Sequence, residues 1–72
     1  MSVLGERIVK AAETCQVPPN LEEIFTLVCG YAPPAGGSHP DVLRRNVKET
    51  VDTMCSREIG HTYDALKNRG LL

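Results

Sequence analysis

Hydrophobic residues recur at helical spacing in four segments of the chain. The first covers residues 2–14, where Ser2 can cap the N-terminus of a helix. Its apolar positions fall on one helical face: Leu4, Ile8, Ala11, Ala12 and Cys15. The helix is expected to end before Pro18 and Pro19, because a residue preceding proline is disfavoured in the helical region.

The second segment has the clearest start signal. Asn20 can cap the helix, and Glu23 can bond back to the N–H of the cap residue in a capping box. The buried stripe is Leu21, Ile24, Phe25 and Val28. Gly30 is expected to end this helix in a left-handed conformation.

Residues 30–39, GYAPPAGGSH, form the predicted loop. Two prolines and three glycines in ten residues favour neither a helix nor a central strand. A glycine-rich phosphate loop is the alternative, but the stretch lacks the lysine and the preceding strand of such loops. We therefore expect a surface connection inside one domain, residues 1–72.

The third segment starts at Ser38 or His39, with Pro40 in its first turn, and continues to about residue 54. Its inner positions are Leu43, Val47, Val51 (or Thr50) and Met54. Its polar positions are Arg44, Arg45, Lys48, Glu49 and Asp52.

In the fourth segment Ser56 is the expected cap, and Glu58 lies in the first turn, where the helix dipole favours an acid. The inner face is Ile59, Tyr63 and Leu66. Gly70 is the expected stop, with Leu71 and Leu72 folding back on the last turn. No glycine or proline separates the third and fourth segments, so one continuous helix is the alternative.

Composition supports an all-α fold, a small bundle of about four helices. A chain of 72 residues forms at most one domain and buries only about 60% of its unfolded surface. With 42% hydrophobic residues, one Phe and no Trp, its core must be aliphatic. A core this small gives limited stability, so we expect that the protein can gain stability by self-association, for instance as a homodimer.

Candidate chemistry is sparse, so we expect a non-enzyme without cofactor or metal. Cys15, Cys29 and Cys55 lie beside or on apolar helical faces, where packing in the core is the expected role. None of them stands at the short spacing of zinc ligands, and neither His39 nor His61 completes a local catalytic motif. The start of the chain lacks a signal-peptide pattern and no membrane span is evident, which favours a reduced, cytoplasmic protein.

The charge is unevenly distributed along the chain. Residues 1–39 hold two basic and four acidic residues, a net charge of −2, whereas residues 40–72 hold six basic and five acidic residues, a net charge of +1. The total of −1 argues against a strongly electrostatic nucleic-acid binder, but the clustered basic residues all lie in the second half.

The ending TYDALKNRGLL resembles the recognition helix of bacterial winged-helix repressors, and residues 20–72 follow their helix order. The resemblance is to small bacterial or phage helix-turn-helix regulators and implies binding to double-stranded DNA. The sequence stops at Leu72, where a wing would begin, so we expect no wing.

On this hypothesis helix 57–69 enters the major groove and presents Arg57, His61, Thr62, Asn68 and Arg69. Helix 40–54 contacts phosphates through Arg44, Arg45 and Lys48. The alternative is that both are solvated faces, with ion pairs Arg45–Glu49 and Lys48–Asp52. Arg44 has no such partner and is the better candidate for an intermolecular contact.

The second functional hypothesis is a helical protein-interaction module, an adaptor or inhibitor that does not bind nucleic acid. Its candidate interface is the Leu4/Ile8 face of the first helix together with Leu71 and Leu72. The Leu4/Ile8 face has no evident role in a three-helix core, and all four residues are apolar, as a partner-binding stripe requires.

Overall fold

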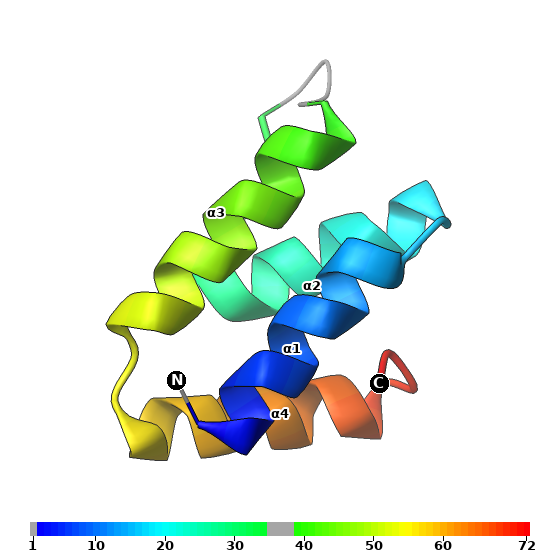
Figure 1. The fold of residues 1–72 in the computed structure, drawn as a ribbon. Coiled ribbons are helices and arrows are strands. Elements are labelled where there is room, and N and C mark those ends of the chain that lie inside the picture. Colours follow the sequence, from blue (N-terminus) through cyan, green and yellow to red (C-terminus); the bar gives the residue numbers. More distant parts are fainter. Residues whose placement is uncertain (1, 35–38) are drawn as a thin grey trace.

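The computed structural model describes residues 2–34 and 39–72 as four helices (Figure 1). The helices are α1 (Val3–Thr14), α2 (Pro18–Cys29), α3 (Pro40–Thr53) and α4 (Ser56–Asn68). The described residues contain no strand. The predicted all-α fold of four helices is therefore confirmed, and α3 and α4 are two helices rather than one.

α1 and α3 lie side by side, and α2 and α4 cross them (Figure 1). In Figure 1, α1 and α3 run beside each other in opposite directions, α2 crosses behind them, and α4 lies across their lower ends. α3 packs most extensively against α2 and next against α1, whereas α4 packs against α1 and α2. Although only Met54 and Cys55 join α3 to α4, these two helices scarcely contact each other. The two helices that the sequence analysis expects to form a helix-turn-helix are therefore joined by a short connection but pack mainly against α1 and α2.

All four helices contribute to one aliphatic core. Phe25 is its largest side chain, and twelve hydrophobic residues are buried among those that the structure describes: Ile8, Val9, Ala12, Leu21, Ile24, Phe25, Val28, Leu43, Val47, Val51, Ile59 and Leu66. The inner face of α1 belongs to this core, so α1 completes the fold. No helix among the described residues is long and apolar enough to cross a membrane.

Two helix starts differ from the prediction. α2 begins at Pro18 with Val17 as N-cap, so the predicted Asn20 capping box is wrong. Proline fixes φ near its helical value and has no N–H to satisfy, so the two prolines that end α1 also start α2. α4 begins at Ser56 itself, with Cys55 as N-cap and no side-chain cap.

The other starts agree better with the sequence. Ser2 caps α1, its Oγ accepting from the N–H of Gly5 at 3.1 Å. His39 caps α3, its Nδ1 accepting from the N–H of Asp41 at 3.1 Å. The alternative cap, Ser38, lies outside the described residues.

Both predicted glycine stops are confirmed. Gly30 follows α2 with φ 84°, and Gly70 follows α4 with φ 71°, a left-handed conformation that favours glycine. The N–H of Leu71 then donates to the carbonyl of Leu66 at 3.0 Å, which turns the chain back. Leu71 packs against the core, whereas Leu72 stays 45% exposed.

Candidate functional site

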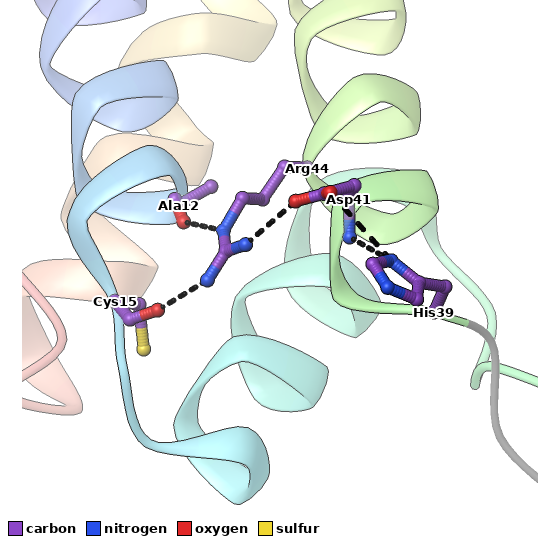
Figure 2. A network of polar contacts seen from close by, with 5 residues as sticks. All are labelled: Ala12, Cys15, His39, Asp41 and Arg44. Atoms are coloured by element: carbon purple, nitrogen blue, oxygen red, sulfur yellow. Dashed lines mark hydrogen bonds and ion pairs between the residues drawn. The ribbon is translucent and has the colours of Figure 1, made fainter.

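Arg44 joins α3 to the end of α1 (Figure 2). Its Nε donates to the carbonyl of Ala12 at 3.1 Å, and its Nη2 donates to the carbonyl of Cys15 at 2.8 Å. Its Nη1 donates to Asp41 Oδ1 at 3.0 Å. The side chain is only 22% exposed. The expectation that Arg44 lacks an internal partner is therefore wrong.

The reason lies in the end of α1, which has no basic residue in its last turn and no glycine cap. The last carbonyls of a helix have no partner within the helix, and a cation there also interacts favourably with the helix dipole. Arg44 supplies both the donors and the charge from α3. We call this contact between Arg44, Ala12 and Cys15 the α1–α3 seam.

The remaining predicted phosphate contacts lie on the solvent side of α3. The predicted Lys48–Asp52 ion pair is confirmed, with 3.3 Å between Nζ and Oδ2. The predicted Arg45–Glu49 pair is wrong: both side chains are exposed and form no ion pair among the described residues. Because Asp41, Asp52 and Glu49 share this side of α3, acidic residues outnumber the two exposed basic ones.

The predicted base-reading residues divide into two groups. Helical spacing places Arg57, His61 and Asn68 on one exposed side of α4, together with Asp64. Arg69 instead turns to α2, where its Nε donates to Glu23 Oε2 at 2.6 Å. Arg69 thus connects the end of α4 to α2, the helix that contains Glu23.

A first groove runs between the end of α2 and the start of α4, and we call it the α2–α4 groove. Its volume is about 360 Å³. Arg57, His61 and the half-buried Thr62 line it, so three predicted site residues meet there. The lining is completed by Val28, Met54 and Glu58. The groove therefore contains one acidic residue, Glu58, beside the cation Arg57.

A second groove, the α1–α4 groove, lies between α1 and the C-terminal part of the chain. Its volume is about 330 Å³, and it is lined by Arg7, Lys10, Ala11, Thr14, Tyr63 and Leu72. Arg7 Nη1 donates to Tyr63 Oη at 3.2 Å and so connects the two sides. This lining contains two cations and no acidic residue.

The predicted protein interface is only partly available. Ile8 is completely buried in the core, so its assignment to an exposed interface is wrong, and Leu4 and Leu71 are half-buried against the core. Leu72 remains exposed and lines the α1–α4 groove. Arg7, Lys10 and Tyr63 were not among the predicted site residues, although the i, i+3 spacing of Arg7 and Lys10 already indicates that these two are neighbours on the helix.

The cysteines do not belong to the buried core. Cys15 and Cys29 are half-buried at its edge, and Cys55 is exposed at the N-cap of α4, so the predicted core position of Cys55 is wrong. Its Sγ lies 3.5 Å from Glu58 Oε1. Among residues 2–34 and 39–72, no three His, Cys, Asp or Glu side chains gather as metal ligands.

Comparison of the chain with protein-family models, curated proteins and solved structures found no match.

Proposed function

We propose that the protein is a small helical protein-interaction module that binds a segment of a partner protein in the α1–α4 groove. The observation that carries this proposal is the exposed apolar surface between two helices. Leu72 is 45% exposed there, and Tyr63 is half-buried with its hydroxyl at the rim. A groove of about 330 Å³ is large enough for one or two partner side chains.

The side chains of this groove suit protein recognition. Tyrosine combines a large apolar ring with a polar group and is enriched among residues that dominate binding energy at interfaces. Ala11 also lines the groove, and its small side chain leaves room for a side chain of the partner. The net charge of −1 is compatible with a protein partner.

The test is a selection of peptides from a random displayed library on the folded protein. Each recovered peptide is then measured on Thr14→Trp, which fills the groove, and on Thr53→Trp. These two threonines are matched: each is the exposed last residue of a helix, and each hydroxyl donates to a carbonyl of its own helix, at 2.9 Å and 2.8 Å. Circular dichroism checks that both variants fold.

We expect the peptides to bind Thr14→Trp at least about tenfold more weakly than the wild type, the equivalent of about 1.4 kcal/mol. Thr53→Trp should bind as the wild type does. A selection in which every peptide binds both variants equally, or in which no peptide is recovered, contradicts the proposal.

A second candidate function is binding of duplex DNA through the outer side of α4. The observation that favours it is the alignment of Arg57, His61 and Asn68 on one exposed side. Two features oppose it: Asp64 lies among these residues, and Arg44 is used in the α1–α3 seam. A titration with labelled duplex at low salt tests it. DNA binding requires an affinity that falls steeply with salt and that drops in Arg57→Ala.

A further inference from the structure

The basic side chains of this protein differ in whether an internal acid neutralises them. Three form ion pairs with carboxylates: Arg44, Lys48 and Arg69. The other five form no such pair among the described residues: Arg7, Lys10, Arg45, Arg57 and Lys67. These five charges are available to an external anion.

Among the described residues, the α1–α4 groove gathers two of these cations beside an apolar surface. Arg7 and Lys10 belong to its lining, and none of the other lining residues is acidic. Arg57 in the α2–α4 groove lies beside Glu58, and Arg45 lines neither of these two grooves. The acidic residues of α1, Glu6 and Glu13, flank Lys10 on the side away from this groove, where they line a separate hollow with Val9, Lys10 and Thr14.

The position of Arg7 leaves most of its donors free. A guanidinium has five N–H groups, and Arg7 gives one to Tyr63 Oη at 3.2 Å, which holds its side chain toward α4. The planar guanidinium can bind a carboxylate through two parallel hydrogen bonds. Lys10 follows one turn later, with its Cβ about 5–6 Å away. The two cations therefore match two carboxylates spaced by one helical turn.

We infer that the partner segment is an acidic, amphipathic peptide, and this inference rests on the proposed function of the groove. Two of its carboxylates bind Arg7 and Lys10, and an adjacent apolar side chain lies against Tyr63 and Leu72. Charge complementarity sets the preference for acidic over basic segments, and the apolar contact keeps the segment in the groove.

A nucleic acid also carries anionic groups, but this surface fits it less well. Phosphates are spaced along a long polyanion, and neutralising several of them is what gives such binding its strength. Here two cations lie together on a chain of net charge −1, with Glu6 and Glu13 on the same helix. A short acidic peptide in the α1–α4 groove contacts the two cations from the side on which no acidic residue lines the surface, whereas a long polyanion would also pass Glu6 and Glu13 beside Lys10.

The experiment reverses one charge and repeats the peptide selection. Lys10→Glu places a carboxylate in the groove at an exposed helical position, and Arg45→Glu makes the same change of charge on α3, outside the groove. Peptides recovered on the wild type should be enriched in Asp and Glu. They should bind Lys10→Glu at least about tenfold more weakly and Arg45→Glu within about twofold.

A selection performed on Lys10→Glu itself should recover peptides that have lost this acidic enrichment. Neutral or basic wild-type peptides that still depend on Thr14 would overturn the inference while leaving the proposed function intact. Peptides that ignore Thr14→Trp would overturn both. A labelled oligonucleotide that competes with the peptides, and binds more tightly than they do, would assign the groove to nucleic acid and also overturn the inference.

Discussion

Two arginines connect α1 to another helix, and they do so in opposite ways. Arg44 reaches from α3 to α1 and uses three donors inside the molecule, at distances of 2.8–3.1 Å, with a side chain that is 22% exposed. Arg7 reaches from α1 to α4, makes one hydrogen bond of 3.2 Å, and remains exposed. Arg44 completes a helix end, whereas Arg7 lies at the rim of an open groove.

The role of a basic residue on a helix surface therefore depends on which hydrogen-bond acceptors its side chain meets on the neighbouring helix. Arg44 meets carbonyls at the end of α1, where the helix supplies no further N–H for them, so its donors and charge stabilise the fold. Arg7 meets a single hydroxyl of Tyr63, so most of its hydrogen-bonding capacity stays available. We therefore expect mutations in the α1–α3 seam to affect stability and mutations in the α1–α4 groove to affect binding.

The largest effect should come from removing the core residue that fixes α1 for both contacts. Ile8→Ala deletes side-chain volume at a completely buried position and should lower the free energy of unfolding by about 3 kcal/mol. Val3→Ala, at a position 65% exposed on the same helix, should change it by less than about 0.5 kcal/mol. Urea unfolding followed by circular dichroism measures both. Equal effects would mean that α1 is not packed as described.

The next effect concerns the seam itself. Arg44→Ala leaves the carbonyls of Ala12 and Cys15 without these donors and should cost about 2 kcal/mol in the free energy of unfolding. Arg44→Lys should recover only part of this, because an ammonium group lacks the planar fork that reaches both carbonyls. Arg45→Ala removes the neighbouring exposed cation and is the control, with a change below about 0.5 kcal/mol. If Arg44→Ala is as stable as Arg45→Ala, the seam does not stabilise the fold.

The sequence predicted the helices well because helix formation depends on nearby residues. The apolar spacing, the Ser2 cap and the stops at Gly30 and Gly70 are all local signals, and the structure confirms them. The start of α2 was predicted incorrectly because Pro18 and Pro19 have two effects. They end α1, and they are also favoured in the first turn of the next helix.

The candidate site was much less predictable. Arg44 bonds carbonyls 32 and 29 positions away, and a backbone carbonyl has no signature in the sequence. The α1–α4 groove likewise combines Lys10 with Tyr63 and Leu72 from the other end of the chain. Burial of Ile8 follows from α1 packing on α3 and α4, and no local pattern distinguishes that from an exposed apolar stripe.

The smallest effect on stability should come from the groove arginine. Arg7→Ala removes one hydrogen bond between exposed groups and should change the free energy of unfolding by less than about 0.5 kcal/mol. The same variant should weaken binding of the selected peptides by several-fold, since the carboxylate loses its strongest donor. Thermal unfolding and a fluorescence titration separate these two outcomes. A strong loss of stability would make Arg7 a second structural arginine.

The most direct test of the α1–α4 groove as the binding surface is an NMR titration of the labelled protein with a selected peptide. The backbone amides of Ala11, Thr14 and Tyr63 should shift progressively as the peptide is added, and those of Arg44, Arg45 and Asn46 should stay in place. Shifts concentrated on the outer side of α4, around Arg57 and His61, or spread evenly over the protein, would contradict the account.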